Sequence, residues 1–177
     1  MWKTTGMLFQ GSVLMLTAKP SDAVQKLTSG IAAFRSTGAT GFTPWLLSNF
    51  ARAYADLGQF DDAWRCISEA MTAVETTKEK WCEADIHRMA WEIALKSPQP
   101  DTAKAEAYFE RALAVARAQQ AKSWELRAAM SMARLWRDQG KRAAARALLA
   151  PVYNWFTEGF NTLDLKEAKA LLDELAS

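Results

Sequence analysis

The feature that most constrains this chain is an internal repeat of about 40 residues. Segments of similar pattern begin at residues 11, 51, 91 and 133. The alanine that opens the second half of each segment recurs at intervals of 40, 42 and 40 residues, at Ala23, Ala63, Ala105 and Ala145. A period of this length is typical of repeat proteins, in which each unit buries its apolar face against its neighbours.

The composition indicates that each repeated unit is made of helices. Residues that favour helix dominate, while the 177 residues contain only 8 glycines and 5 prolines. No Asn-Gly or Asp-Gly dipeptide, the turn that most strongly indicates a β-hairpin, separates alternating apolar runs. We therefore predict an all-α protein with a core of ordinary size.

The predicted fold is one domain over residues 1–177, made of about four helical hairpins and a C-terminal capping helix. The hairpins cover about 1–38, 39–78, 79–120 and 121–160, and the cap covers about 164–175. Within them, helices are expected at about 4–17, 21–37, 43–57, 60–76, 80–96, 101–119, 121–139 and 141–157. The capping helix is amphipathic, which suits the end of a repeat array.

Local signals mark several helix ends. Thr43 can cap the third helix, with Pro44 at its first position, where a missing N–H has no cost. Gly58 and Gly140 are placed to end helices, and Pro151 falls inside the eighth helix, where a kink is expected.

Small residues at matching positions allow the paired helices to approach closely. They are Gly11, Ala51 and Ala133. Trp91 stands at the same position of the third segment, which predicts that the third hairpin packs differently.

The second segment, "ARAYADLGQFDDAWRCISEA", resembles the tetratricopeptide repeat. The similarity is carried by Ala51, Tyr54, Gly58, Phe60, Ala63 and Ala70. Residues 105–175 also resemble the C-terminal region of bacterial proteins that join a class III adenylate/guanylate cyclase-like domain and a predicted ATPase domain to a tetratricopeptide-like tail. The resemblance implies a right-handed solenoid with an interaction or regulatory role. A tail of this kind would lack the chemistry of its parent, since no G-x-x-x-x-G-K-[ST] loop occurs here.

Charge is distributed unevenly near the C-terminus, although the net charge is only +2. Residues 121–150 hold seven Lys/Arg against two Asp/Glu, whereas residues 151–177 hold two against five. We expect the fold to satisfy this change of sign by packing the basic part near the acidic tail.

Arginines of the basic part fall on one helical face. Arg127, Met130, Arg134 and Arg137 follow the spacing i, i+3, i+7, i+10. In tetratricopeptide-like solenoids the first helix of each hairpin lines a concave groove, so the resemblance implies that this face does so. Applied to the other hairpins, the same offsets predict a protein-binding face of Trp45, Asn49, Arg52, Asp85, Arg88, Glu92, Arg127, Met130, Arg134 and Arg137.

Several interpretations of the arginine face stay open. It is either a solvated surface, with Arg134 and Asp138 as an i, i+4 pair, or a groove for an acidic peptide or for another domain of a longer parent chain. We do not expect nucleic-acid binding, because the basic patch is short and lacks interleaved aromatic residues.

No catalytic, cofactor or metal site is predicted. His87 is the only histidine. With Glu83, four residues before it, it would supply only two ligands, too few for a convincing metal site. Asp61 and Asp62 suit a helix start, and Cys82 has no clear activating partner. We therefore expect a non-enzymatic scaffold; the alternative is a small ligand-binding or enzymatic domain with a pocket in the concave face.

The N-terminal segment leads almost directly into the first hairpin. With no capping helix before it, apolar residues such as Leu8 and Val13 would be exposed, which predicts a longer parent protein or an end-to-end homodimer. Polar residues interrupt its apolar run, so we expect neither a signal peptide nor a membrane span, and a cytoplasmic setting fits the two cysteines best.

Overall fold

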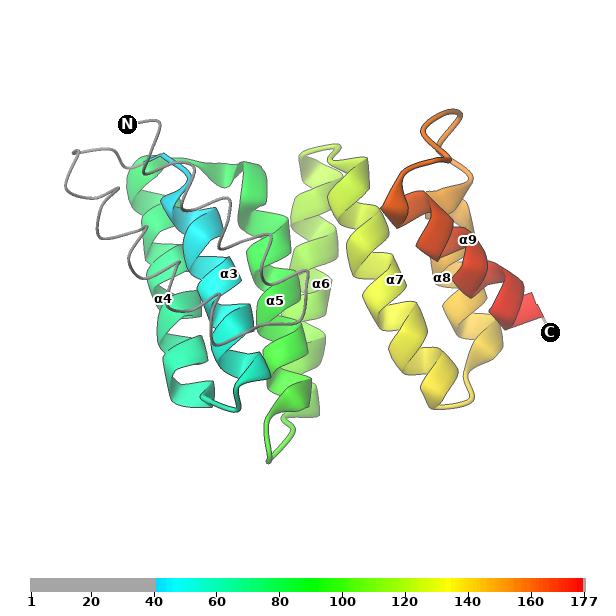
Figure 1. Ribbon diagram of the computed structural model, residues 1–177. Coiled ribbons are helices and arrows are strands. Elements are labelled where there is room, and N and C mark those ends of the chain that lie inside the picture. Colours follow the sequence, from blue (N-terminus) through cyan, green and yellow to red (C-terminus); the bar gives the residue numbers. More distant parts are fainter. Residues whose placement is uncertain (1–40, 177) are drawn as a thin grey trace. The chain divides into compact units, whose positions relative to one another are not determined.

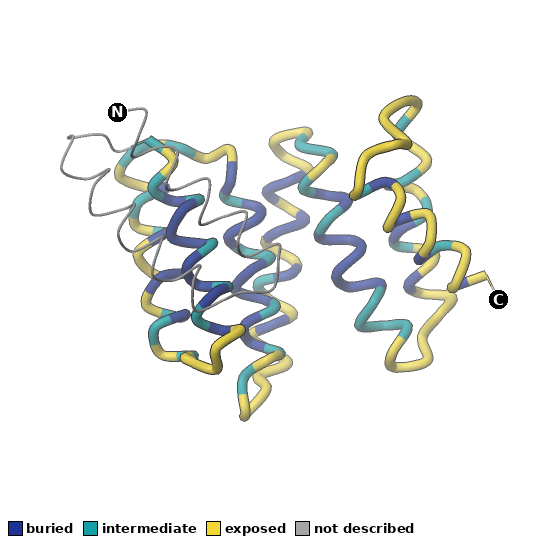
Figure 2. Tube along the Cα trace, viewed as in Figure 1, coloured by how far each residue is buried: buried dark blue, intermediate teal, exposed yellow. Residues whose placement is uncertain are grey.

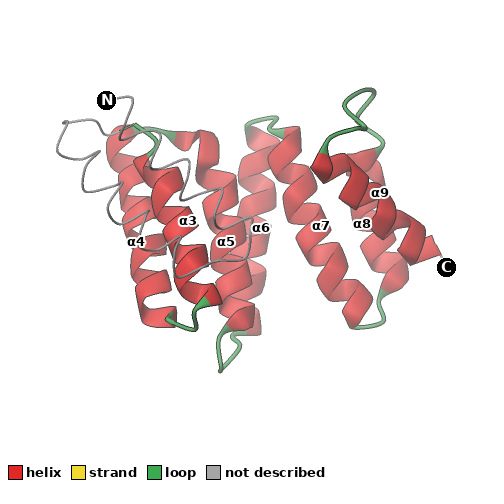
Figure 3. Cartoon of the chain, in the orientation of Figure 1, coloured by secondary structure: helices red, strands yellow, loops and turns green. Residues whose placement is uncertain are grey.

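A computed structural model describes residues 41–176, and these residues are helical throughout except for turns (Figures 1 and 3). No strand occurs among them, so the all-α prediction is confirmed for this part of the chain. In chain order the elements are α3 (Thr43–Asp56), α4 (Phe60–Thr77), the 3₁₀ helix η1 (Lys80–Cys82), α5 (Glu83–Lys96), α6 (Thr102–Ala118), α7 (Lys122–Asp138), α8 (Arg142–Tyr153) and α9 (Leu163–Ala176).

The predicted first hairpin lies outside the described residues. This applies to the helices at about 4–17 and 21–37, to the repeat alanine Ala23 and small residue Gly11, and to the N-terminal end on which the homodimer was predicted.

Two helix ends differ from the prediction. The helix predicted at 141–157 ends already at Tyr153, two residues after Pro151. Because proline has no N–H to donate to the carbonyl of Ala147, the last turn of α8 is weakened. The predicted cap of α3 was also wrong: the N-cap is Phe42, with a φ of 63°. Its N–H donates to Glu79 Oε2 at 2.9 Å.

The turns inside two hairpins have the same geometry. Gly58 and Gly140 have φ values of 75° and 76°, in the left-handed region that glycine adopts without strain. The next N–H then reaches back across the end of the helix, from Gln59 to the carbonyl of Tyr54 at 2.8 Å and from Lys141 to that of Trp136 at 2.7 Å. The predicted stops at both glycines are therefore confirmed.

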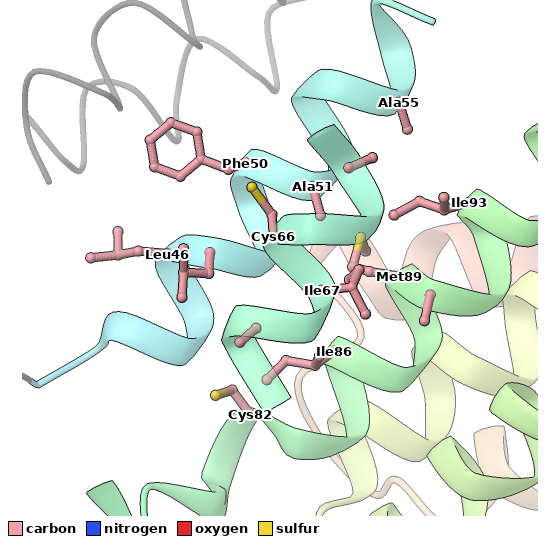
Figure 4. Close-up of a cluster of buried hydrophobic side chains, with 14 of the residues drawn as sticks. Leu46, Phe50, Ala51, Ala55, Cys66, Ile67, Cys82, Ile86, Met89 and Ile93 are labelled. Carbon is pink, nitrogen blue, oxygen red and sulfur yellow. The ribbon is translucent and has the colours of Figure 1, made fainter. Parts of the chain in front are cut away.

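The chain divides between Tyr108 and Phe109, inside α6, into two compact units. In the first unit, α3 packs against α4 and α5, and α4 packs against α5. Their facing sides share one apolar core, to which Figure 4 shows α4 contributing Cys66 and Ile67. The labelled core residues are Leu46, Phe50, Ala51, Ala55, Cys66, Ile67, Cys82, Ile86, Met89 and Ile93.

Second helices of successive hairpins also meet in the first unit. The ring of Trp64 on α4 stacks on that of Tyr108 at 5.8 Å between centroids. Lys104, in the first turn of α6, places its Nζ 3.6 Å from the centre of the Trp64 ring. Trp64 of α4 therefore packs against the first two turns of α6, the second helix of the next hairpin.

Trp91 lies at the position of the third hairpin that matches the small residues of the others, as the sequence indicated. It is five residues before the end of α5, as Ala51 and Ala133 are before the ends of α3 and α7. Ala51 and Ala63 are twelve residues apart, as are Ala133 and Ala145, whereas Trp91 and Ala105 are fourteen apart. The two extra residues lie in the linker between α5 and α6, which has five residues where the turns after α3 and α7 have three.

The second unit has its own core, formed by α7, α8 and α9. α9 packs against both α7 and α8 with the apolar stripe of Leu165, Ala168, Leu171 and Leu175. Figure 2 shows the remaining sides of α9 largely exposed, and the residues there include Lys166, Glu167, Lys169, Asp173 and Glu174. An apolar inner stripe and a charged outer side are the properties of a cap.

Candidate protein-interaction face

The arginines of α7 lie on the side of the helix that meets α9. The side chains of Arg127, Arg134 and Arg137 are 39%, 42% and 32% exposed. Met130, which the sequence placed in the same row, is instead 3% exposed in the core of the second unit. The row on the surface thus consists of three arginines, with a gap where Met130 turns inward.

Each of the three arginines pairs with a carboxylate of α9. Arg127 Nε lies 2.7 Å from Asp164 Oδ2, Arg134 Nη2 lies 2.6 Å from Glu167 Oε2, and Arg137 Nη1 lies 2.7 Å from Glu174 Oε2. The basic part therefore packs on the acidic tail, as predicted from the charge distribution. The predicted Arg134–Asp138 pair is wrong, because Asp138 accepts from Arg137 Nε at 2.9 Å.

The acidic residues of α9 complete this arrangement and were missed from the sequence. Asp164, Glu167 and Glu174 follow the spacing i, i+3, i+10, which places them on one face beside the apolar stripe. This spacing is the signal that could have matched them to the arginines. Hydrogen bonds to Asp138 and Glu174 raise the pKa of Arg137 above its ordinary value.

The three predicted residues of α5 satisfy one another. Arg88 Nη2 lies 2.6 Å from Asp85 Oδ1, and Arg88 Nη1 lies 2.6 Å from Glu92 Oε1. Burial of Arg88, whose side chain is 13% exposed, opposes its charge, but the two carboxylates outweigh burial and raise its pKa. These charges form an internal network of one helix.

The predicted residues of α3 lie on the partly exposed side of that helix. Trp45 packs against the core of the first unit, and its ring centre is 6.4 Å from that of Trp81. Asn49 donates to the carbonyl of Trp45 at 3.0 Å. Arg52 is half-buried and makes no ion pair among residues 41–176.

A buried carboxylate at the start of α7 was not singled out from the sequence. The Glu125 side chain is 5% exposed and accepts from Lys122 Nζ at 2.7 Å and from Arg117 Nε at 2.9 Å. Burial raises the pKa of this carboxyl, but the hydrogen bonds from Lys122 and Arg117 outweigh it, and the pKa is lowered. The two cations thus keep Glu125 ionised.

Glu125→Gln is expected to lower the free energy of unfolding by roughly 1 kcal/mol at pH 7, because it removes the charge that both cations face. Since the folded pKa is lowered, this stabilisation is complete above the ordinary pKa of glutamate and is lost as the pH falls through the folded value. Urea titrations at several pH values measure the difference between parent and variant. A difference that grows below about pH 4 would contradict the assignment.

His87 and the acidic pair of α4, which were considered from the sequence as catalytic candidates, lie near other side chains of the first unit. His87 Nε2 lies 3.9 Å from Glu83 Oε1, and its ring centre is 6.1 Å from that of Tyr108. Asp61 and Asp62 lie in the first turn of α4, where Asp62 also pairs with Arg65 at 2.6 Å. In the described part of the chain, no three residues of the His, Cys, Asp or Glu type gather as a metal site.

Both cysteines are expected to be inert in the folded protein. Burial raises the pKa of Cys66 to about 11 and that of Cys82 to about 12, so both remain protonated thiols. With an aromatic disulfide reagent at pH 8, we expect almost no reaction of the native chain and reaction of both thiols in urea. Rapid labelling of one thiol without denaturant would show that the site is open.

No helix among residues 41–176 is long and apolar enough to cross a membrane. No protein-family model matches the chain, and no curated protein matches it. A functional proposal for this chain therefore rests on its own structure, above all on the contact of the α7 arginines with α9.

Proposed function

We propose that this chain is a non-catalytic helical-repeat scaffold, a tetratricopeptide-like solenoid that binds protein segments or another domain of its own parent protein. The observation that carries the proposal is the contact of α7 with α9. Three arginines of one face hold an acidic amphipathic helix, while apolar residues of that helix enter the core beside them. Recognition of a helix by an apolar stripe flanked by charges is a common mode of protein binding.

The ligand class that we propose for this face is an acidic amphipathic segment. Arginine forks suit carboxylates and remain charged, and the face already accepts such a segment from within the chain. The wider setting that we propose is a cytoplasmic regulatory tail of a bacterial cyclase-linked ATPase. Its support is the resemblance of residues 105–175 to such tails.

The test is a competition for the arginines. Because α9 is tethered, its effective concentration at the face is high, and a free acidic peptide competes poorly with it. Replacing Glu167 and Glu174 with glutamine removes two ion pairs and leaves the apolar stripe intact. We expect a labelled peptide of residues 163–176 to bind this double variant at low ionic strength at least about fivefold tighter than the parent chain.

A matched control carries the same change of net charge on another helix. Glu69 and Glu75 are exposed on α4, and replacing both with glutamine should leave peptide binding unchanged. A short DNA duplex should not bind the parent at the same ionic strength. Equal peptide binding by all three proteins, or a preference for DNA, would contradict the proposal.

A further inference from the structure

α8 and the last turn of α9 enclose an open groove of about 620 Å³ in the second unit. Its α8 side is formed by Ala143, Arg146, Ala147, Ala150 and Pro151. These residues lie on the side of α8 that faces away from the core, since Ala145, Leu149 and Val152 point into it. The groove is separate from the arginines of α7.

The repeat identifies what this part of α8 does in an earlier hairpin. Ala63 and Ala145 are equivalent, so Arg146 takes the place of Trp64. In the first unit Trp64 holds the beginning of α6, through Tyr108 at 5.8 Å and Lys104 at 3.6 Å. The groove therefore occupies the position at which the second helix of a following hairpin would pack.

α9 packs on the hairpin before it as the first helix of a following hairpin does. It contacts both α7 and α8, as α5 contacts both α3 and α4. The first unit shows where the second helix of such a hairpin packs, since α6 follows α5 and meets Trp64 of α4. The groove is thus continuous with the series of interfaces that builds the repeat.

Charge indicates what kind of helix the groove would accept. The cations of α7 all have carboxylate partners, whereas Arg146 on α8 and Lys141, the N-cap residue of α8, make no ion pair within the described residues. Pro151 also leaves the carbonyl of Ala147 without its helical donor. Arg146, the residue equivalent to Trp64, thus carries a positive charge without a partner carboxylate in the described part of the chain. In the first unit the residue that faces this position is Lys104 of α6.

We propose that this groove binds an amphipathic helix of a partner protein, which packs on α8 as α6 packs on Trp64 of α4 and places a carboxylate against Arg146. The proposal rests on the scaffold function and adds a second surface and its partner class. The partner helix presents small or apolar residues to the alanines of α8 and an acidic residue at the position equivalent to Lys104.

The probe for this groove is a peptide of residues 101–119, the α6 sequence, with and without Lys104→Glu. Binding of each labelled peptide to the full 177-residue chain is measured by fluorescence anisotropy. We expect the K104E peptide to bind about tenfold tighter than the unmodified peptide, because it exchanges repulsion from Arg146 for attraction. Arg146→Glu in the chain should reverse this order.

Two further variants separate the groove from other surfaces. Ala147→Tyr fills the groove at an exposed position and should abolish binding of the K104E peptide without lowering the thermal stability of the chain. Arg65→Glu on α4 makes the same charge reversal at another exposed arginine and should leave both peptides unaffected.

The proposal is overturned if neither peptide binds, or if binding occurs and is insensitive to Arg146→Glu and Ala147→Tyr. A homodimer of the chain that dissociates in the Ala147→Tyr variant would assign the groove to a second copy, which also overturns it. Failure here is distinguishable from failure of the scaffold function, because the competition for the arginines varies Glu167 and Glu174, which do not line the groove, and uses no α6 peptide.

Discussion

Leu149→Ala is expected to lower the free energy of unfolding by about 2 to 5 kcal/mol. Leu149 is fully buried in the core that α7, α8 and α9 share. Truncation removes three carbon atoms and leaves a cavity that the three packed helices can close only in part. The change is measured by urea denaturation followed by circular dichroism.

The neighbouring Leu148 provides the control. It is only partly buried against the same core, so Leu148→Ala should cost roughly 1 kcal/mol. Equal losses for Leu148→Ala and Leu149→Ala would mean that α8 does not present the face to the core that the structure gives it.

Ala133→Leu is expected to lower the free energy of unfolding by about 1 to 3 kcal/mol, through overpacking in place of cavity formation. Ala133 on α7 and Ala145 on α8 are both fully buried in one cluster, so there is no room for a larger side chain. The same measurement applies to Ala63→Leu, which overpacks the interface of α3 and α4 in the first unit.

Two controls test whether the effect belongs to the helix interface. Ala144→Leu adds the same atoms at an exposed position of α8 and should change stability by less than about 0.5 kcal/mol. Arg134→Ala should also change it little, because Arg134 and Glu167 are 42% and 44% exposed and such pairs contribute on the order of 0 to 1 kcal/mol. A comparable loss from all the substitutions would contradict the assignment of faces.

The ion pairs between α7 and α9 are partly exposed, which fits the proposal that another acidic segment can replace α9 at the arginines. Its apolar stripe supplies most of the burial, whereas Asp164, Glu167 and Glu174 set which helix face meets α7. Charges at the rim of an interface select a partner more than they strengthen it. In the contact proposed for the groove of α8 the two roles are divided in the same way: the alanines provide the apolar surface, and Arg146 selects a helix with a carboxylate.

Much of the candidate face could be predicted because helical spacing is regular. The sequence placed Arg127, Arg134 and Arg137 on one side of a helix, and the change of sign in charge predicted that this side meets the acidic tail. The individual pairs could not be predicted, because they depend on the crossing of α7 and α9. Helical spacing alone suggested a pair of Arg134 with Asp138 of the same helix, whereas in the structure Arg134 donates to Glu167 of α9.

The sequence by itself determined the all-helical class, the glycine stops at residues 58 and 140, and the fully buried alanines 63, 105 and 145. These features depend on local backbone preferences and on a period that survives divergence of the side chains. Only the tertiary structure decided that Met130 turns inward and that Glu125 is buried between two cations. A shift of one residue rotates a helical side chain by about 100°, and which face is buried is then fixed by the neighbouring helices.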